Sequence, residues 1–281
     1  MMPLHHVAVR DTRLAVHTAG AGVPLVLLHA FPLDHGMWER QAPLADHLRL
    51  IVPDLRGFGR SGDSLPESIS QFADDTVALL DALHVEGPAV ICGISMGGYV
   101  AQQIVARHPD RVAAAVLVDT RLQADTPEAR AGRTDLAAKV GRLGQGILAD
   151  AMIPRLLAES AAARGLPGRA DVESLLRQLI LAQPVETIQA ALAALGSRPD
   201  MTAEMQQARP PMLLVVGEED AITPPAFMEQ AEEIIPHAKL LIVPQAGHLP
   251  PLEQPEIFNA AVLDFLRELP ADRLGGVTRA D

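Results

Sequence analysis

Eight short runs of aliphatic and β-branched residues recur along the chain, and longer stretches with helical spacing of apolar residues separate most of them. The later runs are almost wholly apolar, as strands buried on both faces of a sheet require. This alternation predicts an α/β fold in which a mostly parallel eight-stranded sheet is flanked by helices. The expected strands are Val7–Val9, Leu14–Thr18, Leu25–Leu28, Leu50–Val52, Ala89–Cys92, Ala115–Val118, Met212–Val216 and Leu240–Val243.

The first two runs are separated only by the residues from Arg10 to Arg13, so they are expected to form an antiparallel hairpin. Helices are expected where apolar residues return at helical spacing. They cover Phe72 to Leu83, Ser95 to Arg107, and about Glu256 to Leu269.

The alternation of strands and helices fails between Arg121 and Ala208, where Ala, Leu, Arg and Gln dominate and no strand is expected. We expect a core at residues 1–120 and 209–270, with residues 121–208 inserted as a helical cap. Residues 271–281 hold two glycines and little apolar material, which predicts a flexible tail. Prolines are expected to divide the cap into several short helices, at Pro127, Pro154, Pro167, Pro184 and Pro199.

Charge and composition exclude several classes of protein. The formal net charge of −12 repels nucleic-acid phosphates and anionic membranes, so neither is expected as a partner. The sequence contains no apolar stretch of about 20 residues, and His5, His6 and Arg10 interrupt any early signal-like run. A cytoplasmic location is the default expectation. Cys92 is the only cysteine, so no internal disulfide is expected, and no Cys or His cluster at ligand spacing predicts a metal site.

The pentapeptide Gly93-Ile94-Ser95-Met96-Gly97 stands between an expected strand and an expected helix. A serine at such a sharp turn needs small residues two positions away on either side, because side chains there would collide. Ser95 is therefore the candidate nucleophile. The alternative is a glycine-rich turn with an incidental serine.

A serine hydroxyl needs a base within hydrogen-bond reach. His248 follows the last expected strand and precedes the last helix, which places it at the same sheet edge as Ser95. Structural roles are expected for the other histidines, and His29 is expected to brace the loop in which it lies.

The base in turn needs a carboxylate that orients its ring. Asp220 lies a few residues beyond the seventh expected strand and 28 residues before His248 (248 minus 220), which leaves room for one helix and one strand. Glu218, Glu219 and Asp119 are the competing acids. Asp119 is expected to serve the junction with the cap or the serine turn instead.

Acyl transfer develops an oxyanion that needs fixed hydrogen-bond donors. The backbone N–H of Met96, at the start of a helix, is one candidate. The N–H of Phe31, in the loop after the third strand, is the other. Trp38 follows that loop and is a candidate for the wall of a substrate pocket, although a large aromatic residue is more often part of the core.

Five ordered motifs together resemble the α/β-hydrolase superfamily over nearly the whole chain from Pro24 to Leu269. Within that superfamily the chain is similar to small carboxylesterases, 3-oxoadipate enol-lactone hydrolases and cofactor-free haloperoxidases. Ala30 departs from the glycine usual in its loop, and Ser95 replaces the aspartate of haloalkane dehalogenases and epoxide hydrolases, which disfavours those activities. The motifs are Leu27 to Pro32, Asp54 to Ser61, Gly93 to Gly98, Gly217 to Pro224, and Gly247-His248.

The residues and the resemblance together imply a serine hydrolase that cleaves a small carboxylic ester or lactone through an acyl-enzyme, with no cofactor. Two alternatives stay open: perhydrolysis, in which peroxide replaces water, and a ligand-binding receptor of this fold with little turnover. A small-molecule ester or lactone is the expected partner, and the sequence leaves a homo-oligomer open.

Overall fold

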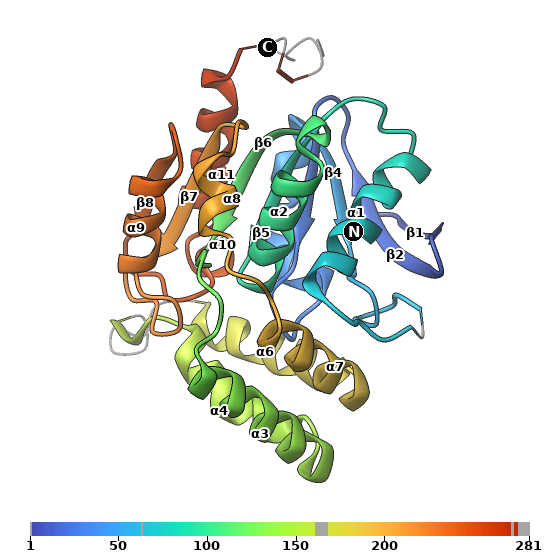
Figure 1. Ribbon diagram of the computed structural model, residues 1–281, viewed down its shortest axis with the longest axis vertical. Coiled ribbons are helices and arrows are strands. Elements are labelled where there is room, and N and C mark those ends of the chain that lie inside the picture. Colours follow the sequence, from blue (N-terminus) through green and yellow to red (C-terminus); the bar gives the residue numbers. More distant parts are fainter. Residues whose placement is uncertain (1, 63, 161–167, 271–272, 275–281) are drawn as a thin grey trace.

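The computed structural model of the protein describes residues 2–62, 64–160, 168–270 and 273–274 (Figure 1). Within these residues, eight strands form one sheet in the order β1-β2-β4-β3-β5-β6-β7-β8. All eight expected strands are present, as parts of β1 (Leu4–Val9), β2 (Thr12–Ala19), β3 (Pro24–Leu28), β4 (Arg49–Pro53), β5 (Ala89–Ile94), β6 (Val112–Val118), β7 (Met212–Gly217) and β8 (Lys239–Val243).

The sheet is mostly parallel, as predicted. Strands β4, β3, β5, β6, β7 and β8 run parallel to one another. Strands β1 and β2 form the expected antiparallel hairpin, and β2 pairs antiparallel with β4. Every residue of β5, β6 and β7 is buried, which explains why these runs contain so few polar side chains.

Helices pack around the sheet in two groups. The first contains α1 (Ile69–Ala82), which packs against α2 (Met96–Arg107). The second contains η1 (His35–Asp46), which packs against α10 (Pro250–Glu253) and α11 (Pro255–Glu268). Helix α1 begins at Ile69, before the expected start at Phe72. The Ser68 hydroxyl accepts the Gln71 N–H at 3.1 Å and so caps the first turn. The short η2 (Pro109–Arg111) and α9 (Ala226–Ile234) complete the core.

A helical insertion separates β6 from β7. It contains α3 (Pro127–Leu143), α4 (Gly146–Leu156), α6 (Arg169–Ala182), α7 (Val185–Gly196) and α8 (Thr202–Gln206). Helix α3 packs against α7 and α4 against α6, and these four lie together below the sheet in Figure 1. No strand occurs in the described part of residues 121–208, as expected.

The prolines divide the insertion only in part. Pro127 begins α3 and Pro184 separates α6 from α7, as predicted. Pro154 instead lies inside α4, so the prediction that it ends a helix is wrong. Because α4 ends two residues later, the missing proline N–H removes only one backbone bond from its last turn. Pro167 and most of the expected tail at residues 271–281 lie outside the described residues.

None of the helices in the described ranges is long and apolar enough to cross a membrane alone; α6 and α7 meet that test only as a pair, bent by 97°.

Candidate active site

Ser95 stands at the sharp turn between β5 and α2, with a φ angle of +52°. This left-handed conformation is costly for a residue with a side chain and is common where function requires it. From Ala89 to Val105 every residue is buried except Ser95, which is partly exposed. A Cβ atom on Gly93 would lie 2.0 Å from the Gly97 carbonyl oxygen, and one on Gly97 would lie 2.1 Å from the Leu28 carbonyl oxygen. The predicted need for glycine on both sides of Ser95 is confirmed.

His248 and Asp220 form a buried pair on the loops that follow β8 and β7. His248 Nδ1 lies 2.8 Å from Asp220 Oδ2, and the residues are only 2% and 3% exposed. An ionised carboxylate can only accept, so Nδ1 is the donor of this pair, and in the neutral ring Nε2 is then the acceptor nitrogen. The pair therefore presents a nitrogen that can accept a proton from a nucleophile.

Four hydrogen bonds hold the Asp220 carboxylate. Oδ1 accepts the backbone N–H groups of Ile222 at 2.7 Å and Thr223 at 3.1 Å, and Oδ2 accepts the Thr223 hydroxyl at 2.7 Å and His248 Nδ1. Burial alone would raise the pKa of Asp220, but the charge of His248 and these donors lower it well below its usual range. The carboxylate thus stays ionised.

Ser95 reaches the same sheet edge, since its N–H donates to the carbonyl of Val118 at the end of β6. No hydrogen bond joins the Ser95 hydroxyl to His248 anywhere in the described structure. In ligand-free active sites this contact is often long and tightens when substrate binds.

Asp119 lies beside the His248–Asp220 pair. One oxygen of Asp119, one oxygen of Asp220 and one ring nitrogen of His248 lie within 4.8 Å of one another. Asp119 Oδ1 accepts the Gly217 N–H at 2.9 Å. The prediction that Asp119 serves the cap junction or the serine turn is therefore wrong: β6 and β7 are neighbours, and the end of β6 faces the base of the Asp220 loop.

The two competing glutamates have other partners. Glu219 accepts the N–H of Ser160 at 2.9 Å and also its hydroxyl. Glu218 is exposed and accepts the Gln245 N–H at 3.2 Å. Of the four acids considered from the sequence, Asp220 is the one hydrogen-bonded to His248.

The two candidate oxyanion donors lie on segments in direct contact. A Cβ atom on Gly97 would also lie 2.9 Å from the His29 carbonyl oxygen, so the start of α2 packs against the loop that carries Phe31. Met96 is the first residue of α2, and its N–H has no partner within its own helix. Neither the Phe31 N–H nor the Met96 N–H donates to an acceptor among the described residues. Their role in binding an oxyanion stays a prediction.

His29 braces the same loop, as predicted. Its Nδ1 lies 3.0 Å from the Ala30 carbonyl oxygen, and its Nε2 accepts the Leu55 N–H at 3.0 Å. The ring is fully buried, and burial lowers the pKa of His29. This neutral imidazole joins the loop after β3 to the loop after β4.

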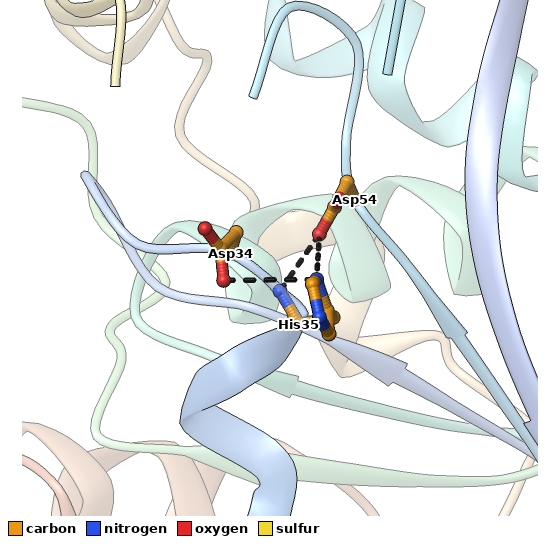
Figure 2. Close-up of side chains that lie close together, drawn as sticks. All are labelled: Asp34, His35 and Asp54. Carbon is orange, nitrogen blue, oxygen red and sulfur yellow. Dashed lines mark hydrogen bonds and ion pairs between the residues drawn. The ribbon is translucent and has the colours of Figure 1, made fainter. Parts of the chain in front are cut away.

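A second connection between these loops was not found from the sequence. Figure 2 shows Asp34, His35 and Asp54 close together; the backbone N–H and Nδ1 of His35 both donate to Asp54 Oδ1, at 2.8 and 2.7 Å. Three of their atoms lie within 4.8 Å, a spacing that a metal ion can use. The carboxylates are already engaged, however: Asp34 Oδ2 accepts Gln183 Nε2 at 3.0 Å, and Asp54 Oδ2 accepts the Arg60 N–H at 2.8 Å. The arrangement is a hydrogen-bonded brace.

Trp38 is fully buried, and its ring packs against Phe258 with centroids 6.2 Å apart. Trp38 therefore occupies a core position, as is more common for a large aromatic residue than a place in a pocket wall.

The insertion is bonded directly to the loop that carries His248. The His248 N–H donates to the Leu156 carbonyl oxygen at 2.9 Å. The Glu253 carboxylate accepts the N–H of Gly247 at 2.8 Å and that of Ala158 at 2.7 Å, and burial raises the pKa of Glu253. The backbone of the candidate base therefore rests partly on the insertion.

The chain matches known proteins over most of its length. The family model described as alpha/beta hydrolase fold matches residues 23–255. The chain is 33% identical over 251 residues to the pimeloyl-[acyl-carrier protein] methyl ester esterase of Nitrosomonas europaea, covering 86% of this chain and 95% of that protein. A thermophilic esterase from Thermogutta terrifontis superposes with a TM-score of 0.89 at 40% identity, covering 95% and 98% of the two chains. The enol-lactonase from Burkholderia xenovorans does so with a TM-score of 0.86 at 28% identity, covering 94% and 100%.

Proposed function

Because the chain belongs to the alpha/beta-hydrolase family, we propose that it is a serine hydrolase that cleaves a small carboxylic ester or lactone. The observation that carries the proposal is the partly exposed Ser95 at positive φ, on the sheet edge that also holds the buried His248–Asp220 pair. The proposed reaction uses no cofactor. Esterases and an enol-lactonase among the similar proteins support this substrate class.

In the proposed first half-reaction, Ser95 Oγ attacks the carbonyl carbon while His248 Nε2 takes the hydroxyl proton. The carbonyl oxygen becomes negative and accepts hydrogen bonds from the Phe31 and Met96 N–H groups. His248 then returns the proton to the departing alcohol, and an acyl-enzyme remains on Ser95. Asp220 stabilises the imidazolium form of His248 throughout.

In the second half-reaction, water takes the place of the alcohol. His248 removes a proton from the water as its oxygen attacks the acyl carbon, and the same proton returns to Ser95 Oγ when the acyl bond breaks. The products are a carboxylic acid and the regenerated hydroxyl. A lactone follows the same route, but its alcohol stays attached to the acyl chain.

The test combines labelling with kinetics. A fluorophosphonate should label Ser95 in the wild-type protein, and Ser95→Ala should remove both the label and ester hydrolysis, by several orders of magnitude, without loss of fold. A panel of aryl esters and lactones of increasing acyl length, assayed with and without hydrogen peroxide, identifies the preferred substrate and acceptor. Strong hydrolysis by Ser95→Ala would end the proposal.

A further inference from the structure

We infer that Asp119 is a neutral carboxylic acid that donates its Oδ2–H to the Asp220 carboxylate, and so positions the residue that orients His248. The catalytic part of this inference rests on the proposed function. The protonation state of Asp119 does not, and it is testable without any enzyme assay.

The geometry around Asp119 leaves one oxygen unexplained. The residue is 0% exposed, and its Oδ1 accepts the Gly217 N–H. Its Oδ2 is buried and has no hydrogen-bond partner among the described residues. A buried polar atom without a partner is costly. The Asp220 carboxylate is the neighbouring acceptor for a proton on Oδ2, since one oxygen of each carboxyl group and one ring nitrogen of His248 lie within 4.8 Å of one another.

The hydrogen bonds decide which carboxyl group carries the proton. When two carboxyl groups lie this close in a buried site, the negative charge of the first makes ionisation of the second unfavourable. Among the described residues, Asp220 has four donors, two of them from Thr223 and one from His248, whereas Asp119 has the Gly217 N–H alone. The negative charge is therefore more stable on Asp220, and the proton stays on Asp119.

The surrounding charges act in the same direction. The ionisable groups placed near Asp119 are Asp220, His248 and Glu253. Burial, then the charge of Asp220 and, further down, that of Glu253, raise the pKa of Asp119 well above its ordinary value. A φ angle of +42° at Asp119 holds the backbone in a strained turn that directs the side chain toward β7.

A neutral Asp119 has two consequences for the site. Asp119 Oδ1 accepts the Gly217 N–H at the end of β7, and its Oδ2–H would donate to the Asp220 carboxylate. The short segment from Gly217 to Asp220 would then be held at both ends. It also leaves one negative charge beside His248. A second one would stabilise imidazolium in the free enzyme and shift the loss of activity to higher pH.

The first experiment compares Asp119→Asn and Asp119→Ala. Asparagine copies the shape of the neutral acid and keeps a donor, so kcat/KM should stay within about tenfold, and the acid limb of its pH profile within about 0.2 pH unit. Alanine removes both contacts, so kcat should fall at least about tenfold with KM nearly unchanged. If Asp119 were ionised, the asparagine variant would lose a negative charge beside His248, and its acid limb would move down by about one unit or more. That shift, or full activity of Asp119→Ala, would overturn the inference.

The second experiment needs no substrate. An infrared difference spectrum between the wild-type protein and Asp119→Asn at pH 7 should lose the C=O stretch of a protonated carboxylic acid. Asp200→Asn is the matched control, because Asp200 is an exposed carboxylate that accepts the Thr202 N–H, and its removal should subtract a carboxylate band. A carboxylate band in the Asp119 spectrum would overturn the inference even if Asp119→Ala does not fold. A protein that shows the acid band but hydrolyses no ester would instead refute the proposed function.

Discussion

His248 Nδ1 lies 2.8 Å from Asp220 Oδ2, although 28 positions separate the two residues (248 minus 220). The chain between them forms α9 and then β8, which pairs in parallel with β7. The loops that follow these two strands therefore emerge side by side. A change to the Asp220 carboxylate should act on His248 directly, without a path through the rest of the fold.

Asp220→Asn should lower kcat by a factor on the order of 10³–10⁴ with little change in KM, because the amide neither fixes the tautomer nor stabilises imidazolium. Glu218→Gln is the matched control on the same loop: Glu218 is exposed, and activity should stay within about tenfold. Steady-state kinetics with one activated ester is sufficient. If Asp220→Asn kept nearly full activity, the acid would have to be assigned to another residue.

The rate should fall toward acid pH, because protonation of His248 removes the free base. Burial would raise the pKa of Asp220, but His248 and the other donors lower it well below its usual range, so Asp220 stays ionised throughout the fall. A single protonation, that of His248, should then control the acid limb of the pH profile, and kcat/KM should fall about tenfold for each pH unit on that limb. A flat profile down to about pH 5 would count against His248 as the base.

Within the insertion, Asp125 pairs with three arginines, Arg121, Arg133 and Arg198. Asp125→Asn should lower the free energy of unfolding by about 3–5 kcal/mol, because buried Arg198 loses its counter-ion. Burial would raise the pKa of Asp125, but Arg133 and Arg198 lower it from 3.8 to about 2. A carboxylate whose pKa is lowered in the folded protein stabilises the fold at pH values above its unfolded pKa, and this stabilisation is lost as the pH falls through the folded pKa. The difference in free energy of unfolding between variant and wild type should therefore be full above about pH 4 and shrink as the pH falls toward about 2.

Urea unfolding at several pH values measures that difference. Asp150→Asn is the control, since Asp150 pairs with Arg177 at the surface, where both side chains are exposed, and it should change stability by less than about 1 kcal/mol. Equal losses in the two variants would refute a special role for Asp125.

Exchanging residues 121–208 for the same segment of a relative should change the ratio of kcat/KM between short and long acyl chains more than the reactivity of Ser95 toward a fluorophosphonate. The reason is that helices laid over the carboxyl ends of the strands would form the acyl wall, whereas the nucleophile lies on the core. An unchanged acyl preference in the exchanged protein would show that the insertion does not set selectivity.

The strands were predictable because each is a short apolar run, but their order was not. Apolar spacing shows that a segment is buried without showing which segment it pairs with, and β4 lies between β2 and β3 in the sheet. The same limit produced the error at Asp119. Its position after a strand was clear from the sequence, whereas its contact with Gly217 depends on β6 and β7 being neighbours.

Ser95, Asp220 and His248 could be proposed because each follows a recognisable strand. The brace in Figure 2 had no such signal. Gln183 Nε2 contacts Asp34 Oδ2 across 149 positions of sequence, and its Oε1 accepts the Gly59 N–H at 2.9 Å. In the sequence, a single glutamine between two helices cannot be distinguished from an exposed polar loop residue. Its role follows only from the tertiary structure, which brings the loops together.

The hydrogen bond from the His248 N–H to the Leu156 carbonyl oxygen couples the position of the insertion to the position of the candidate base. An outward swing of α4 would have to break this bond, and with it the bridge that Glu253 forms between Gly247 and Ala158. The backbone under the imidazole would then lose its support at the moment the site opened. A molecule with the insertion swung outward would then lack a correctly supported His248 and could not react. Any variant that weakened the contacts of the insertion would therefore lower the fraction of enzyme able to react.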